Sequence, residues 1–101
     1  MMMTFDVSEK DIEEVVQNYV TSMEPFKLKV FPSKEKKKYI LLRFMIKLFK
    51  EDIKYSEVEV NRILKPVYKD YVMIRRYLID YGYLKRLDDG RAYWVNSNKK
   101  G

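Results

Sequence analysis

The sequence predicts an α+β fold of the winged helix-turn-helix type, a three-helix core with a small antiparallel β-sheet, preceded by an extra N-terminal amphipathic helix. The prediction follows from two successive helix signals, the second over residues 71–81, and from a basic β-hairpin signal over residues 83–95. Two short helices with a tight junction have helix-turn-helix geometry, and a hairpin after them supplies a wing. We expect one domain over residues 1–101, with the winged-helix core at 33–95 and a disordered polar tail at 96–101.

Composition excludes several classes of function. A chain of 101 residues is long enough to bury about two thirds of its unfolded surface in one core. The absence of Cys and His removes disulfides, thiolate metal sites and the usual neutral-pH base. The sequence also lacks a Gly-rich phosphate loop, a Gly-x-Ser-x-Gly motif and metal-ligand spacing. We therefore expect no enzymatic activity, no cofactor and no metal site.

The same sequence predicts a cytoplasmic protein that does not enter a membrane. No apolar run reaches the length that spans a bilayer. Residues 1–10 also lack the basic region followed by an apolar core that is typical of a secretory signal.

Charge is distributed unevenly along the chain. Residues 1–26 hold one basic and six acidic residues, a net charge of −5, whereas residues 27–101 hold 20 basic and nine acidic residues, a net charge of +11. Lys and Arg side chains that meet phosphates release condensed counterions, so the basic body indicates a polyanionic partner. The alternative is that the lysines are solvated and only keep the protein soluble.

An amphipathic helix is predicted over residues 8–24. Ser8 can cap it, Asp11 stands where a capping box places an acid, and Pro25 stops it. Its apolar residues recur at helical spacing: Ile12, Val15, Val16, Tyr19, Val20 and Met23. We expect this stripe to cover the core. The alternatives are an arm that forms a homodimer, or a lid over a basic surface.

The central helix is predicted from Ser33, as its cap, to about Lys50, after a short strand or extended linker over residues 27–31. Apolar residues surround nearly all of it, so we expect it to be the most buried helix. Its first turns carry a lysine cluster that includes Lys36 and Lys37, where positive charge is unfavourable by about 0.3–1 kcal/mol per residue. Phosphate contact and a solvated helix end are both open explanations.

The helix-turn-helix follows. Residues 53–55 are long enough only for a minimal strand, and Ser56 with Glu59 forms a capping box that starts the next helix. Pro66 weakens the end of that helix, which gives way to a turn around Lys69.

The last helix is framed by Asp70, whose carboxylate can accept hydrogen bonds from the first turn, and by Gly82, which can end a helix in the left-handed conformation. At 100° per residue its buried stripe contains Ile74, Leu78 and Tyr81.

The opposite face of this helix contains Val72, Arg76 and Ile79, with Arg75 on its shoulder. We choose Arg75 and Arg76 as DNA contacts, because the guanidinium fork matches both phosphate oxygens and the guanine edge in the major groove. Val72 and Ile79 would touch thymine methyl groups or would mark a protein interface.

The hairpin is predicted to turn at Asp89-Gly90, a dipeptide typical of the two-residue type I′ turn. Such a turn pairs Leu84 with Val95, Lys85 with Trp94, Arg86 with Tyr93 and Asp88 with Arg91. A three-residue loop with a bulge would instead exchange the faces of Tyr93 and Trp94. Near the tip, Arg86 and Arg91 can reach phosphates or a minor groove, or they pair with the acidic residues beside them.

Several runs together resemble a known bacterial domain family: Phe31-Pro32-Ser33-Lys34, Tyr55-Ser56-Glu57, Asp70-Tyr71, Arg75-Arg76-Tyr77-Leu78, Asp80-Tyr81-Gly82 and Tyr93-Trp94. That family is uncharacterised, occurs alone or attached to regulators of the ArsR type, and its members are labelled transcriptional regulators. The resemblance covers about residues 31–95, and the family has no established function to carry over. Residues 1–26 lie outside it, so that here an acidic helix stands in place of a complete DNA-binding module.

These observations indicate a DNA-binding transcriptional regulator whose partner is double-stranded DNA. The expected contact residues are Lys36, Lys37, Lys69, Tyr71, Val72, Arg75, Arg76, Arg86 and Arg91. One alternative is a protein-interaction or dimerisation module that binds no nucleic acid. The other is RNA binding, in which Tyr71, Trp94 and the lysines supply stacking and charge.

Overall fold

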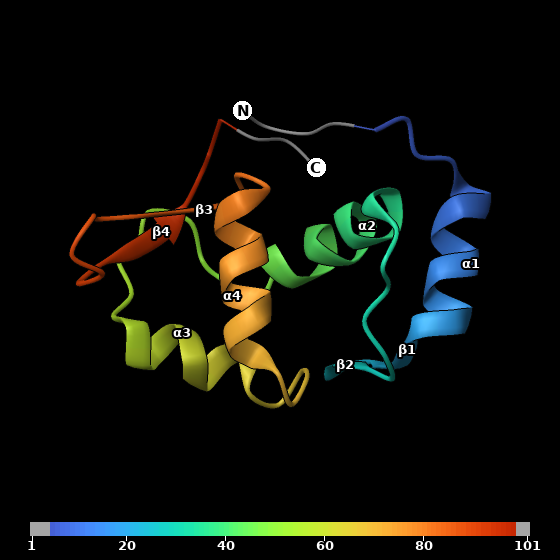
Figure 1. Ribbon diagram of the computed structural model, residues 1–101, viewed down its shortest axis with the longest axis horizontal. Coiled ribbons are helices and arrows are strands. Elements are labelled where there is room, and N and C mark those ends of the chain that lie inside the picture. The colour runs from blue at the N-terminus through green and yellow to red at the C-terminus, as the bar shows by residue number, and fades with distance from the viewer. Residues whose placement is uncertain (1–4, 99–101) are drawn as a thin grey trace.

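Four helices and two short antiparallel hairpins form the part of the chain that the computed structural model describes, residues 5–98. In chain order the elements are α1 (Glu9–Tyr19), β1 (Val20–Met23), β2 (Phe26–Leu28), α2 (Glu35–Ile46), α3 (Glu57–Leu64), α4 (Tyr71–Asp80), β3 (Leu84–Arg86) and β4 (Tyr93–Val95). Figure 1 shows α2 and α4 in the middle, with α1 at one end of the molecule and the β3–β4 hairpin at the other. The predicted α+β class is confirmed, and the order is compatible with a small wing-like fold.

The core forms where α2, α3 and α4 meet. α2 supplies five buried residues, more than any other described helix, which confirms that it is the central one. The predicted stripe of α4 is also confirmed, since Ile74 and Leu78 have no exposed surface and Tyr81 is 3% exposed. Partners with no exposed surface come from α2 and α3: Leu41, Leu42, Met45, Val60 and Leu64.

Three helices begin at the residues that the capping signals predict. Ser8 and Ser56 each form a reciprocal capping box with the acid three residues later. Asp70 Oδ1 accepts a hydrogen bond from the Met73 amide at 3.2 Å. Gly82 follows α4 with a φ of 80°, the left-handed conformation that glycine adopts without a Cβ clash.

The prediction that the N-terminal helix extends to residue 24 is wrong. α1 ends at Tyr19, and Val20–Met23 forms β1, which pairs with β2 through a turn that contains the cis Glu24-Pro25 bond. The Lys29 amide also donates to the Tyr19 carbonyl at 2.8 Å. Pairing with a neighbouring strand satisfies this backbone in the extended form, which suits β-branched side chains better than a helix does.

The predicted bounds of the central helix are also wrong at both ends. Lys34 rather than Ser33 is the N-cap of α2, and no side chain caps it. The helix ends at Ile46 instead of about Lys50. The next three amides donate to carbonyls only three residues back, and these tight turns return Phe49 to the core, where it is 5% exposed.

The register of the second hairpin is confirmed: Leu84 pairs with Val95, Lys85 with Trp94 and Arg86 with Tyr93. The predicted turn type, in contrast, is wrong. A type I′ turn at Asp89-Gly90 requires positive φ at both residues, and only Gly90 has it, with a φ of 75°. Instead, the Gly90 amide donates to the Leu87 carbonyl at 2.9 Å, which centres the turn one residue earlier.

One residue of the predicted strand at 53–55 joins this hairpin. The Tyr55 and Tyr93 backbones exchange two hydrogen bonds, of 2.7 and 2.8 Å, in an antiparallel bridge. The segment before the helix-turn-helix is therefore tied to β4.

The prediction of a disordered tail over residues 96–101 is wrong for its first residue, Asn96. Asn96 is 8% exposed, its amide donates to the Tyr83 carbonyl at 2.9 Å, and its side-chain amide donates to the Gly82 carbonyl at 2.9 Å. These bonds hold the chain against the end of α4. Residues 99–101 lie outside the described part of the chain.

No helix within residues 5–98 combines the length and the apolar character that crossing a membrane requires.

Replacing Leu78 by Ala should lower the free energy of unfolding by about 2–5 kcal/mol, because burial is lost and a cavity remains. Urea denaturation followed by circular dichroism measures this change. The matched control is Val58→Ala, at a helix position that is 63% exposed, where the expected change is about 0.5 kcal/mol or less. Equal losses in the two variants would contradict the placement of the core.

Candidate nucleic-acid interface

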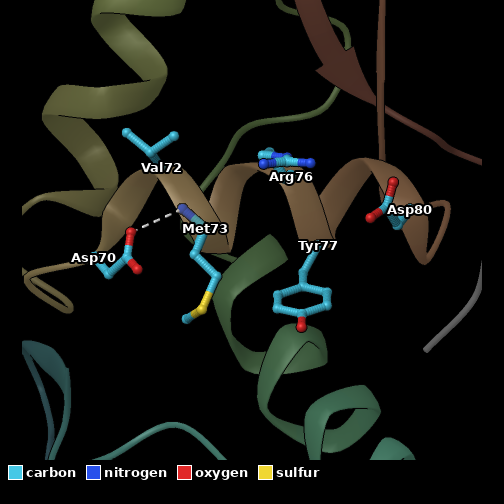
Figure 2. A pocket seen from close by; sticks show the side chains of 6 residues that line it. All are labelled: Asp70, Val72, Met73, Arg76, Tyr77 and Asp80. Carbon is cyan, nitrogen blue, oxygen red and sulfur yellow. Dashed lines mark hydrogen bonds between the residues drawn. The ribbon is translucent and has the colours of Figure 1, made fainter.

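The outer face of α4 is the centre of the candidate interface. Val72 is 42% exposed and Arg76 is exposed one turn later, on the side opposite the buried stripe. Both residues line a shallow groove of about 400 Å³, together with Asp70, Met73, Tyr77 and Asp80. Figure 2 shows the Val72 and Arg76 side chains on one side of the helix and those of Met73 and Tyr77 on the other, toward α2. Arg76 makes no side-chain hydrogen bond or ion pair with the described residues.

Arg75, in contrast, is held by α3. Its Nη1 donates a 2.5 Å hydrogen bond to Asn61 Oδ1 and lies 3.9 Å from Glu57 Oε2, and its side chain is only 15% exposed. The two arginines predicted as DNA contacts therefore do not point outward together, since Arg76 is exposed and Arg75 is bonded to α3. The helical wheel places Arg75 on the shoulder of α4, and the packing of α3 against that shoulder covers it. Neither partner could be identified before the α3–α4 packing was known.

A second hollow, of about 340 Å³, separates α4 from the hairpin. Arg76 and Arg86 both line it, with Glu57, Arg75, Ile79, Asp80 and Tyr93. The Tyr93 hydroxyl donates to Glu57 Oε1 at 3.0 Å, and burial together with this bond raises the pKa of Tyr93. The structure thus brings together Arg76 of the helix and Arg86 of the hairpin, two of the predicted contacts.

The arginines at the hairpin tip are exposed but have local partners. Arg86 Nη1 lies 3.3 Å from the Leu87 carbonyl and 3.4 Å from the Asp88 carbonyl. Arg91 Nε lies 3.1 Å from Asp89 Oδ2, with an Arg91 side chain that is 84% exposed. An ion pair so exposed contributes little, about 1 kcal/mol at most, so it would not prevent a phosphate from displacing Asp89.

The lysines at the start of α2 lie elsewhere. Lys36 Nζ is 2.8 Å from Asp11 Oδ2 on α1. Lys37 Nζ is 3.4 Å from the Tyr19 hydroxyl and 5.4 Å from the centre of that ring. Lys36 and Lys37 therefore fasten α1 to α2, away from the hairpin, which lies at the other end of the molecule (Figure 1). These contacts give Lys36 and Lys37 a role within the fold at the start of α2.

Two further predicted contacts flank the start of α4. Lys69 is exposed in the turn between α3 and α4, beside a separate groove. Tyr71 is half-buried and packs against the core, so only part of its side chain is available for stacking.

Acidic side chains share this surface. Glu57, Asp70 and Asp80 line the two hollows beside the arginines, so the outer face of α4 is mixed in charge. Among residues 5–98, no three or more acidic side chains gather closely enough to hold a metal ion.

Comparison with known proteins assigns the sequence of this chain to a family. Residues 27–95, more than half of the chain, match a family described as an uncharacterized protein conserved in bacteria, DUF2087. The chain belongs to DUF2087. The DUF2087 match begins just inside β2 and ends with β4, so α1 and β1 lie outside it. No curated protein and no solved structure matches the chain.

The two arginines of α4 should differ in their effect on stability. Arg75→Ala should lower the free energy of unfolding by about 1–3 kcal/mol. The substitution removes the charged hydrogen-bond donor of Asn61 and the cation beside Glu57. Arg76→Ala should change it by about 0.5 kcal/mol or less. Chemical denaturation of both variants measures the difference, and equal effects would show that Arg75 is not held by α3.

The Lys36–Asp11 contact should be visible in a titration. Hydrogen bonds from Lys36 and from the Ser8 amide lower the pKa of Asp11 from 3.8 to about 2. Because the folded-state pKa is depressed, ionised Asp11 stabilises the fold above about pH 4, and this contribution is lost as the pH falls toward 2.

The measurement is an NMR titration of the Asp11 carboxyl carbon. Lys36→Gln should move its pKa upward toward 3.8, whereas the control Lys10→Gln, an exposed lysine on the same helix, should leave it unchanged. An unchanged pKa in Lys36→Gln would contradict the contact.

Proposed function

We propose that this protein is a DNA-binding transcriptional regulator that acts in the cytoplasm, without catalysis or a cofactor. In this proposal the fold is a winged helix: α3 and α4 form the helix-turn-helix and the β3–β4 hairpin forms the wing. α4 would enter the major groove of double-stranded DNA, as the second helix of such motifs does.

The order and pairing of the elements support the winged-helix assignment. α3 and α4 are joined by a short turn and pack against each other, and the hairpin follows α4 directly. The Tyr55 bridge to β4 lies before α3 and adds a third segment to the hairpin.

The observation that carries the proposal is the position of Arg76. It is exposed on the outer face of α4 and shares a hollow with Arg86 of the hairpin. A guanidinium there would reach guanine or a phosphate, and the exposed Val72 would meet a thymine methyl group. Arg86 and Arg91 would contact the backbone or a minor groove beside the helix.

Three other residues predicted to contact DNA have structural roles in this proposal. Arg75 would act as a positioning residue, because its bond to Asn61 fixes α4 against α3. Lys36 and Lys37 would serve the fold rather than DNA, because they contact α1.

The second candidate is a protein-interaction module. It is favoured by the mixed charge of the outer face and by two exposed apolar residues, Val58 at 63% and Val72 at 42%. A homodimer is compatible with either function. The apolar stripe of α1 packs within its own chain, where Val15 is 2% exposed, so α1 would have to meet a second copy through its polar face.

Titration of a mixed-sequence duplex of about 16 base pairs at several salt concentrations tests the proposal. Affinity should fall steeply with salt, and Arg76→Ala should reduce the slope of log K against log salt by about 0.9, the value for one lost phosphate contact. The matched control is Lys10→Ala on α1, which also removes one exposed positive charge and should leave the slope nearly unchanged.

The same titration separates the alternatives. Binding of single-stranded or structured RNA in preference to the duplex would replace DNA by RNA as the partner. No salt-dependent binding of either nucleic acid would favour the protein-interaction module.

A further inference from the structure

Four lysines line one open groove that lies outside the outer face of α4. The groove has a volume of about 440 Å³ and runs between β2 and the turn that joins α3 to α4. Its basic residues are Lys27, Lys29, Lys65 and Lys69, and no acidic residue lines it.

The two walls of the groove are joined through the backbone. The Leu28 amide donates to the Val67 carbonyl at 2.9 Å, which ties β2 to the α3–α4 turn. Leu28 is 8% exposed and Val67 is 4% exposed, so both also anchor in the core. The lysines beside these residues are therefore carried on a backbone that is fixed at both walls.

These lysines differ from those of α2. All four are exposed, and none makes an ion pair, a side-chain hydrogen bond or a ring contact with another residue in the range 5–98. Lys36 and Lys37, by comparison, both contact α1. Gathering four like charges is unfavourable in itself, and no carboxylate within residues 5–98 forms an ion pair with any of the four lysines.

We infer that this four-lysine groove binds the phosphodiester backbone of DNA beside the segment that α4 contacts. The inference rests on the proposed function, because it takes duplex DNA as the partner. An open groove with cationic walls suits a linear polyanion, whose phosphates lysines bind as point charges and without base specificity.

The groove is placed to extend the proposed interface. Lys69 lines it, while the next residue, Asp70, lines the groove on the outer face of α4, so consecutive residues at the start of α4 border the two hollows. The longest dimension of the molecule is 38 Å, which equals about 11 base pairs of B-DNA at about 3.4 Å each. A duplex of about 16 base pairs is longer than this dimension, so its length does not limit the contact.

The test compares paired charge removals in the salt titration of a 16-base-pair duplex. Lys27→Gln with Lys29→Gln removes two charges from the β2 wall, and Lys65→Gln with Lys69→Gln removes two from the turn. Each pair should reduce the slope by about 1.8, at about 0.9 per phosphate contact. The control pair is Lys47→Gln with Lys50→Gln, two exposed lysines after α2 that do not line the groove, and it should keep most of the wild-type slope.

A second measurement needs no variant. In the unaltered protein, the duplex should shift the backbone amide NMR signals of residues 27–29, 65 and 67–69, and these shifts should diminish as salt is added. This experiment applies even if a lysine pair proves necessary for folding.

The outcomes distinguish the two claims. Groove pairs that keep the slope of the control pair, or unshifted amides at 27–29, 65 and 67–69, would overturn the groove as a phosphate site. The effect of Arg76→Ala would then still decide the proposed function. If the wild-type protein shows no salt-dependent binding of the duplex, both claims fail together.

Discussion

The burial of Ile74 and Leu78 determines which side of α4 meets solvent. Neither side chain has exposed surface, because α4 packs against both α2 and α3. At 100° per residue, this constraint turns Arg76 outward and Arg75 toward α3. Two adjacent arginines therefore have different environments: one is exposed beside the hairpin, and the other is bonded to Asn61. The proposed interface depends on that division.

Two groups of basic residues differ in their partners. Lys36, Lys37 and Lys38 of α2 contact α1 or α4, and the Lys36–Asp11 ion pair compensates part of the charge asymmetry between the acidic N-terminal segment and the basic body. The second group lies on β2, the α3–α4 turn and the outer face of α4, and it lacks such partners among the described residues. It also includes the arginines at the hairpin tip, whose partners are only local and exposed. An external polyanion would meet the second group.

Local signals in the sequence predicted much of the fold. Capping residues located the starts of α1, α3 and α4, and the helical period identified the buried stripe of α4. The Asp89-Gly90 dipeptide predicted the register of the β3–β4 hairpin, although the turn itself is centred one residue earlier. These features depend on residues a few positions apart, whose interactions are visible in a sequence.

Features that depend on distant contacts were missed. The end of α1 depends on pairing with β2, and the burial of Asn96 depends on carbonyls after α4. Arg75 and Lys36 looked like surface cations because their partners, Asn61 and Asp11, lie on other helices. The four-lysine groove likewise combines segments almost forty residues apart, which no local pattern could connect.

In the proposed complex, Arg76 and Arg86 face DNA whereas Arg75 faces the protein. The decisive measurement follows the NMR signals of the arginine Nε–Hε groups during addition of a duplex. The Arg76 and Arg86 signals should shift with DNA concentration, while the Arg75 signal, held by Asn61, should stay nearly in place. Signals of Arg76 and Arg86 that do not respond to saturating duplex, or shifts confined to residues of α1 and α2, would contradict it.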